Sequence, residues 1–179
     1  MLADFPFLKT ERLLLRQFLA SDLDHVFQGL SHPEVIKYYG VSYKSLDDTK
    51  QQMEWFKDLE NEGTGIWWAI HSADGENFYG AAGLNNLSMA HKKAEIGFWL
   101  LPTYWGKGIT QEAILVICKY AFEQIKLHRI EALVEFDNKS CKNLMNKLNF
   151  KHEGTMQDCE VKNGNFISLD IYAKLNSTY

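Results

Sequence analysis

A glycine-rich turn, Gly106-Lys107-Gly108, is the segment whose residue types point most directly to chemistry. It follows a predicted strand and precedes a long predicted helix, and the first N–H groups of a helix have no intrahelical partners. These groups and the helix dipole favour a bound phosphate, and glycine lets the backbone approach the anion. A tight strand-to-helix connection without any ligand is the simpler alternative, and the turn alone leaves both interpretations open.

Two well-known phosphate-binding motifs do not fit this turn. A dinucleotide-binding G-x-G-x-x-G motif starting at Gly106 needs a glycine five residues later, where the chain has Gln111. A P-loop needs serine or threonine directly after Gly-Lys, where the chain has Gly108. If the turn binds phosphate, it does so in another structural setting.

Short runs of aromatic and β-branched residues alternate with helical patterns around the turn. We predict strands over residues 12–16, 66–71, 78–84, 94–101, 129–136, 155–161 and 166–173. We predict helices over residues 21–30, 33–39, 45–62, 108–126 and 139–148. Asp74-Gly75 and Asn163-Gly164 mark hairpin turns, and Asn149 suits a left-handed helix stop. This order predicts an α+β fold with a mixed sheet, in one domain over residues 1–179.

Net charge and hydropathy limit the classes of partner that the protein can bind. The chain of 179 residues is 46% hydrophobic and carries a net charge of −4. Because nucleic acids and membrane surfaces are polyanionic, this charge argues against direct binding to either. No apolar run approaches the roughly 20 residues of a membrane span, and the first residues lack the features of a signal peptide. We therefore predict a cytoplasmic protein.

The cysteines and histidines argue against a disulfide-bonded protein and against a metalloprotein. Cys118, Cys141 and Cys159 are odd in number and form no CxxC pair, which suits a reducing compartment without disulfides. The six histidines show neither the HxxxH nor the HExxH spacing that places two metal ligands on one helix face. We predict that the protein holds no metal.

Four segments spaced along the chain share the pattern of a known family. They are Thr10-Glu11-Arg12-Leu13, residues 94–100, residues 104–113, and Asn138 followed by Leu148-Asn149-Phe150 and Glu153-Gly154. Together they resemble the GNAT superfamily of N-acetyltransferases from about residue 8 to residue 175. Within that superfamily they are most similar to the RimJ/RimL type, which acetylates protein N-termini. Four motifs in order are much more specific than one glycine turn.

The resemblance implies a fold and a cofactor. The GNAT fold is a mostly antiparallel sheet of about seven strands, flanked by helices and splayed between its fourth and fifth strands, here residues 94–101 and 129–136. The pantetheine arm of acetyl-CoA lies in that splay, where we expect unpaired backbone groups at Leu100 and Leu101 to bond its amides. The pyrophosphate is expected on main-chain N–H groups of Trp105, Gly106, Lys107, Gly108, Ile109 and Thr110.

Asn138 matches a family asparagine that follows the fifth strand and commonly bonds the pantetheine arm. Asparagine is also a good helix N-cap, and the two roles are compatible. Lys142 and Lys147 could balance the other phosphates of the cofactor, although an exposed lysine on a helix is usually only solvated.

Acetyl transfer to an amine needs a neutral amine, stabilisation of an oxyanion and a proton for the departing thiolate. Glu160, shortly before the Asn163-Gly164 turn, aligns with the glutamate that the RimL-like pattern uses as a base, directly or through water. Glu95 is the second candidate. For each, the alternative is an ordinary solvent-facing or structural carboxylate.

The general acid departs from the superfamily pattern. A tyrosine often stands seven residues after the asparagine, where this chain has Met145. The RimJ/RimL pattern tends to place a serine three residues after it, where this chain has Cys141, with Ser140 adjacent. A thiol can protonate another thiolate because their reference pKa values are similar, near 8.5. A small buried hydrophobic residue is the equally weighted alternative.

The resemblance implies an amine acceptor and leaves its identity open. A protein or peptide N-terminus, such as that of a ribosomal protein, is the first expectation, and a small amine such as a polyamine or an antibiotic is the second. A non-catalytic acetyl-CoA-binding module is the competing class. The aromatic residues could shape the acceptor pocket or belong to the core, namely Trp55, Phe56, Trp67, Trp68 and Tyr104. We expect a monomer or a homodimer.

Overall fold

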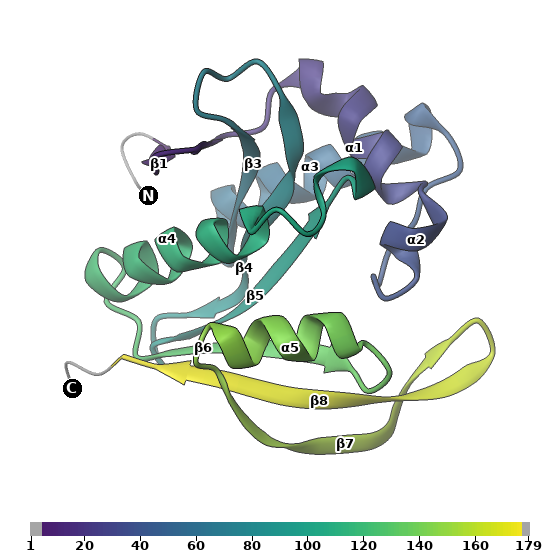
Figure 1. The fold of residues 1–179 in the computed structure, drawn as a ribbon, viewed down its shortest axis with the longest axis vertical. Coiled ribbons are helices and arrows are strands. Elements are labelled where there is room, and N and C mark those ends of the chain that lie inside the picture. Colours follow the sequence, from purple (N-terminus) through teal and green to yellow (C-terminus); the bar gives the residue numbers. More distant parts are fainter. Residues whose placement is uncertain (1–4, 177–179) are drawn as a thin grey trace.

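The computed structural model describes residues 5–176, which form one open eight-stranded sheet with helices on both faces (Figure 1). The strands lie in the order β1-β2-β3-β4-β5-β6-β8-β7. Their bounds are β1 Leu8–Lys9, β2 Leu13–Arg16, β3 Ile66–Ser72, β4 Phe78–Ser88, β5 Lys93–Leu100, β6 Arg129–Glu135, β7 Lys151–Lys162 and β8 Asn165–Leu175. All neighbours pair antiparallel except β5 and β6, which are parallel.

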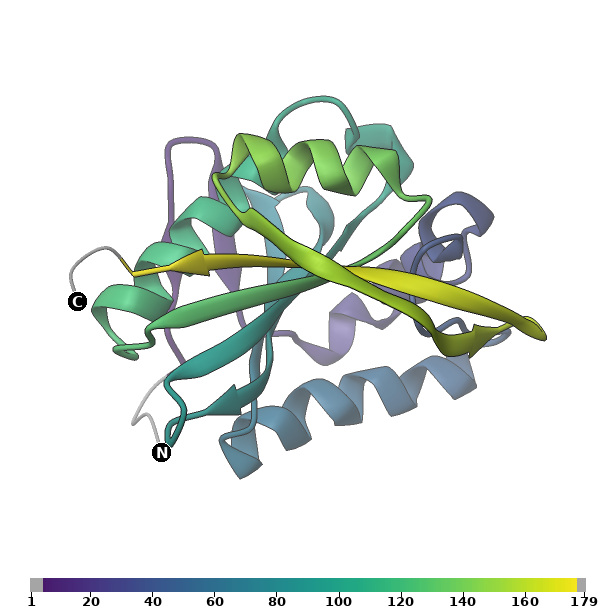
Figure 2. The same cartoon turned by 90° about the horizontal axis from the view of Figure 1, so that it is seen from below.

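The helices cover the two faces unequally. Their bounds are η1 Ala20–Asp22, α1 Leu23–Leu30, α2 Pro33–Ile36, α3 Leu46–Glu62, η2 Pro102–Tyr104, α4 Ile109–Glu123 and α5 Lys139–Lys147. Figure 2 shows α3 on one side of the sheet and α4 and α5 on the other. Two hydrophobic clusters fill the space between the helices and the sheet. The α1–α3 cluster lies under α1 to α3, and the α4 cluster lies under α4 and α5.

The central strand β3 shows how the sequence serves both clusters. Every one of its residues is buried. Because successive side chains point to opposite faces, Trp68 and Ile70 enter the α4 cluster, whereas Trp67 and Ala69 enter the α1–α3 cluster. The continuous apolar run 66–70 is therefore the signature of a strand covered on both faces.

The element types agree with the sequence prediction, and the differences are local. The structure has eight strands instead of seven, because the two residues of β1 pair with β2. Strand β7 begins at 151 instead of 155, and α2 ends at 36 instead of 39. The predicted turn residues Asn149, Asn163 and Gly164 have φ angles of 59°, 50° and 79°, which confirms their left-handed conformation.

The start of α1 was predicted two residues too early. Ser21 lies in the short helix η1, and the carboxylate of Asp22 accepts hydrogen bonds from the Leu19 N–H at 2.8 Å and from Arg16 at 2.7 and 2.8 Å. Burial alone would raise the pKa of Asp22, but these hydrogen bonds outweigh it and hold the pKa below its ordinary value. The Asp22 side chain thus does not cap α1 and instead forms an ion pair with Arg16.

The sheet splays between β5 and β6, as expected. These strands pair only over Lys93–Glu95 and Arg129–Glu131, while β6 continues to pair with β8 as far as Glu135. From Ile96 onward β5 stays on β4 and diverges from β6. The glycine turn therefore begins at the open end of this gap.

Candidate active site

The glycine turn has the backbone geometry of an anion cradle. Gly106 and Gly108 adopt left-handed φ angles of 73° and 76°, which favour glycine, and α4 begins directly after them. The first intrahelical bond runs from the Glu112 N–H to the Gly108 carbonyl at 3.1 Å. The N–H groups of Ile109 and Thr110 therefore have no intrahelical acceptor. The conformation that the sequence predicts is present, with these N–H groups available for an anion.

The indole of Trp105 anchors the turn to the strand before it. Its Nε1–H donates to the Leu100 carbonyl at 2.9 Å. The side chain of Lys107 lies over the ring of Tyr104, with Nζ 5.4 Å from the ring centroid. Binding of the pyrophosphate by residues 105–110 stays a prediction.

The expectation of unpaired backbone groups at Leu101 is wrong. The Leu101 N–H donates to the Tyr79 carbonyl at 2.9 Å, and its carbonyl accepts from the Tyr104 N–H at 3.0 Å. Backbone groups of successive strand residues point to opposite sides, so those of Phe98 and Leu100 face the gap between β5 and β6. At Leu100 the carbonyl already accepts from Trp105, which leaves its N–H as the group offered to a pantetheine amide.

Asn138 caps α5. Its Oδ1 accepts from the Cys141 N–H at 3.1 Å, so the N-cap interpretation is confirmed. A bond from its remaining amide to pantetheine stays a prediction. Lys142 is occupied elsewhere, because its Nζ lies 2.5 Å from the Asp170 carboxylate and 4.0 Å from the centroid of the Phe136 ring. It is therefore a poor candidate for neutralising a phosphate.

Cys141 is half-buried and packs against the α4 cluster. Burial raises the pKa of its thiol to about 12. Protonation of a thiolate with a pKa near 8.5 by such a thiol is unfavourable by roughly 5 kcal/mol, at 1.36 kcal/mol for each pKa unit. This geometry favours a packing role over that of a general acid.

Glu160 lies on the exposed end of the β7–β8 hairpin. A bulge between Met156 and Glu160 precedes it, with Asp158 at a φ of 47°. Two residues further on, Lys162 forms an ion pair with Glu135 and donates to the Lys37 carbonyl at 2.6 Å. Residues two apart in a strand share a face, so Glu160 points to the side of the hairpin where β6 and α2 lie (Figure 1).

The second candidate base lies at the other end of the splay. Glu95 is next to Glu131 where β5 and β6 still pair, and it accepts from Asn86 Nδ2 at 2.9 Å. It is therefore remote from Leu100, where the gap is open. Of the two carboxylates, only Glu160 lies on an element that reaches past the end of β6.

Most of the candidate pocket aromatics belong to the core. Trp67, Trp68 and Phe56 are at most 4% exposed, whereas Trp55 is 38% exposed and Tyr104 is half-buried. Trp67 lies flat across the sheet because Gly83 and Gly97 have no side chains: a Cβ at Gly97 would come within 2.7 Å of its indole. The two glycines thus make room for a core tryptophan.

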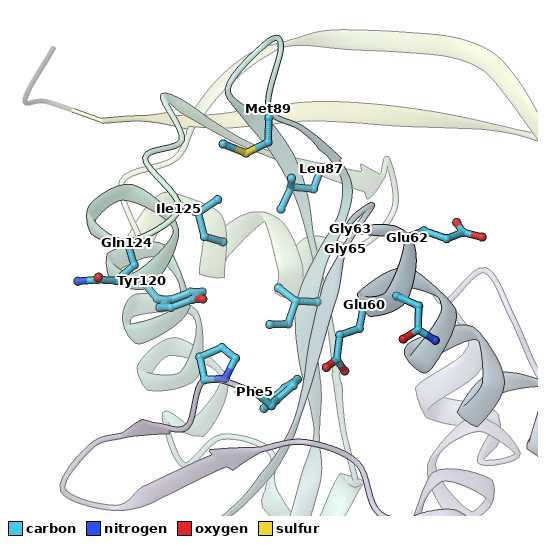
Figure 3. Close-up of a pocket in the computed structure, with 13 residues that line it drawn as sticks. Phe5, Glu60, Glu62, Gly63, Gly65, Leu87, Met89, Tyr120, Gln124 and Ile125 are labelled. Atoms are coloured by element: carbon cyan, nitrogen blue, oxygen red, sulfur yellow. The ribbon is translucent and has the colours of Figure 1, made fainter. Parts of the chain in front are cut away.

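A separate cavity of about 820 Å³ lies between the C-terminal ends of α3 and α4 (Figure 3). Apolar side chains such as Phe5, Leu87, Tyr120 and Ile125 line it, with Glu60 at one side. It includes none of the predicted site residues. Within residues 5–176 no group of three or more His, Cys, Asp or Glu could hold a metal ion. None of the helices in this part of the chain is long and apolar enough to cross a membrane.

A parallel strand pair that splays open, followed by an N–H cradle at the start of a helix, defines a site for an extended cofactor with phosphates at one end. Comparison with known proteins identifies that class. Residues 12–151 match the GNAT acetyltransferase domain family, and the chain belongs to this family. The protein is an acetyl-CoA-dependent N-acetyltransferase.

Three similar proteins show the range of this family. The chain is 33% identical to the uncharacterized N-acetyltransferase YoaA of Bacillus subtilis, over 94% of this chain and 96% of that one. It is 28% identical to the spermidine N(1)-acetyltransferase of Escherichia coli, over 85% and 80%. The structure of RimL, a ribosomal L7/L12 alpha-N-protein acetyltransferase, superposes with a TM-score of 0.87 at 19% identity, over 96% and 95%.

Proposed function

We propose that the protein acetylates the α-amine of a protein or peptide N-terminus, with the acceptor bound beside the β7–β8 hairpin. The observation that carries this proposal is the exposed apolar surface at the end of the hairpin that also carries Glu160, on the face opposite to the Glu160 side chain. Val161 and Phe166 face each other across the hairpin and are 64% and 70% exposed, and Phe136, at the end of β6, is 54% exposed. Exposed apolar side chains that pair across a hairpin suit contact with a polypeptide.

The chemistry of the amine supports the same choice. At neutral pH an α-amine with a pKa of about 8 is roughly one-tenth neutral, whereas an amine near 10.4 is neutral in fewer than about one molecule in a thousand. An α-amine therefore demands less from a single carboxylate base. The RimL-like fold accords with such an acceptor, while the spermidine acetyltransferase makes a polyamine the second candidate.

In the proposed reaction, Glu160 takes a proton from the amine directly or through water. The nitrogen attacks the thioester carbonyl, the C–S bond breaks and an amide bond forms. The coenzyme A thiolate leaves and takes a proton from water, since its pKa near 8.5 requires no strong acid, and Glu160 gives its proton to the hydroxide so formed, which restores the carboxylate. Residues 105–110 hold the pyrophosphate and Asn138 bonds the pantetheine arm. A cytoplasmic location is part of the proposal.

Release of free coenzyme A thiol tests this proposal. Peptides with free N-termini, their N-terminally blocked counterparts, spermidine and an amine-free control are compared at equal concentration. Turnover with free peptides alone supports the proposal, and preferential turnover of spermidine contradicts it.

The variant Val161→Ser/Phe166→Ser should raise KM for the peptide by about tenfold with little change in kcat, because roughly 1–2 kcal/mol of apolar contact is lost. Leu115→Ser, which removes an exposed leucine on α4, is the matched control.

A further inference from the structure

Residues 10–13 lie beneath the glycine turn although about a hundred positions separate them in sequence. They join β1 to β2, and this connection contacts the first turn of α4. The Thr10 hydroxyl donates to Glu112 Oε1, and Arg12 Nε donates to Glu112 Oε2 at 2.7 Å. Arg12 Nη2 lies 2.5 Å from the same Oε2. Thr10 Oγ1 also accepts from the Leu13 N–H at 3.0 Å, which closes the connection.

Arg12 also reaches the middle of the turn. Its Nη1 donates to the Lys107 carbonyl at 3.1 Å. A Cβ at Gly108 would lie 3.6 Å from Nη2, so the guanidinium sits directly against the turn. One side chain thus joins the peptide between the two left-handed glycines to the helix that follows.

We infer that Thr10, Arg12 and Glu112 form a clamp that holds the glycine turn in its anion-binding conformation. This inference rests on the assignment of the turn to the pyrophosphate. Two glycines make the turn flexible, and a cradle works only when its N–H groups converge and its carbonyls point elsewhere. The bond from Arg12 keeps the Lys107 carbonyl turned toward the guanidinium. Arg12 and Glu112 are thus positioning residues for donor binding.

Charge gives the clamp a second role. Glu112 places a carboxylate in the first turn of α4, near the expected phosphate, where an unpaired negative charge would oppose the anion. Burial would raise the pKa of Glu112, but hydrogen bonds from Thr10 and Arg12 and the charge of Arg12 outweigh it and lower the pKa. The carboxylate is therefore ionised and its charge is balanced by Arg12.

Substitutions of Arg12 and Glu112 are expected to change the affinity for coenzyme A by different amounts. Arg12→Ala removes the bond to Lys107 and leaves the Glu112 carboxylate unbalanced, so the Kd for coenzyme A should rise by about tenfold to a hundredfold, the range for losing charged hydrogen bonds. Glu112→Gln keeps an acceptor for Arg12 and removes the charge, so its Kd should change by less than about threefold. The double variant Arg12→Ala/Glu112→Gln should recover only part of the lost affinity, because it removes the unbalanced charge but not the loss of the bond to Lys107. Full recovery would indicate a purely electrostatic role for Arg12.

Calorimetric titration with coenzyme A measures these Kd values, and two acetyl donors separate positioning from general damage. In Arg12→Ala, KM for acetyl-CoA should rise while kcat stays within about twofold. The kcat/KM for S-acetylpantetheine, which has no pyrophosphate, should stay unchanged. Arg129→Ala is the matched control, because Arg129 forms a similar pair with Glu153, with contacts of 2.5 and 2.9 Å, at the closed end of the splay.

Unchanged coenzyme A affinity in Arg12→Ala would overturn the clamp, and so would an equal loss with both donors. Gly108→Glu keeps this failure separate from failure of the site assignment. If Gly108→Glu abolishes coenzyme A binding and Arg12→Ala does not weaken it, the turn binds the pyrophosphate and the clamp is wrong. If neither variant changes affinity, the assignment of the turn itself is wrong.

Discussion

The glycine turn after β5 and the β7–β8 hairpin are held in place in different ways. The turn leads directly into α4, Arg12 donates to its Lys107 carbonyl, and Trp105 ties it to the Leu100 carbonyl at the end of β5. No residue of β7 is buried, the hairpin contains a bulge before Glu160, and Lys162 donates to the Lys37 carbonyl just after α2. The proposed donor end of the site is therefore held by main-chain geometry, and the proposed acceptor end by a few exposed side chains.

This difference has a functional meaning. GNAT acetyltransferases share acetyl-CoA as the donor, and a rigid cradle of N–H groups suits a donor that does not vary. Acceptors differ among relatives, and exposed strand residues can change without disturbing the core. Substitutions at the turn should thus affect donor binding, and substitutions on the hairpin should affect acceptor turnover.

The sharpest test of the donor end is Gly108→Glu, which should weaken coenzyme A binding by on the order of a hundredfold or more. The substitution places a carboxylate in the anion cradle and forces a side chain into a left-handed conformation. Gly63→Glu is the matched control, because Gly63 has a φ of 68° and open space around it at the end of α3. Titration with coenzyme A measures both, and equal affinities would remove the phosphate from this turn.

At the acceptor end, Glu160→Gln should lower kcat/KM at neutral pH by about 10²- to 10⁴-fold, the range for loss of a general base. The affinity for acetyl-CoA should stay unchanged. Below the pKa of the acceptor amine, its neutral fraction rises tenfold with each pH unit, so the rate of the variant should recover as pH rises. Glu153→Gln, on the same strand, is the control. A constant ratio of variant to native rate across pH 6–9 would remove Glu160 from the mechanism.

The same contrast explains what the sequence could predict. The left-handed glycines, the start of α4 and the Asn138 cap depend on local backbone preferences that residue types encode. The contact of Arg12 with Lys107 and Glu112 spans about a hundred residues, and no local period signals it. The two-residue strand β1 and the bulge before Glu160 were missed for another reason: each is defined by its register with the neighbouring strand, which residue types within the segment do not specify.

Cys141 lies in the first turn of α5, and the smallest effect is expected there. Because burial holds the pKa of its thiol at about 12, it stays protonated at working pH and contributes no titration to the rate between pH 6 and 9. Cys141→Ala and Cys141→Ser should therefore keep kcat within about threefold of the native value, with similar pH profiles. The measurement is kcat across that range at saturating acetyl-CoA. Activity that survives in Cys141→Ser and is lost in Cys141→Ala would instead identify a proton donor at this position and extend the catalytic groups from the hairpin to the first turn of α5.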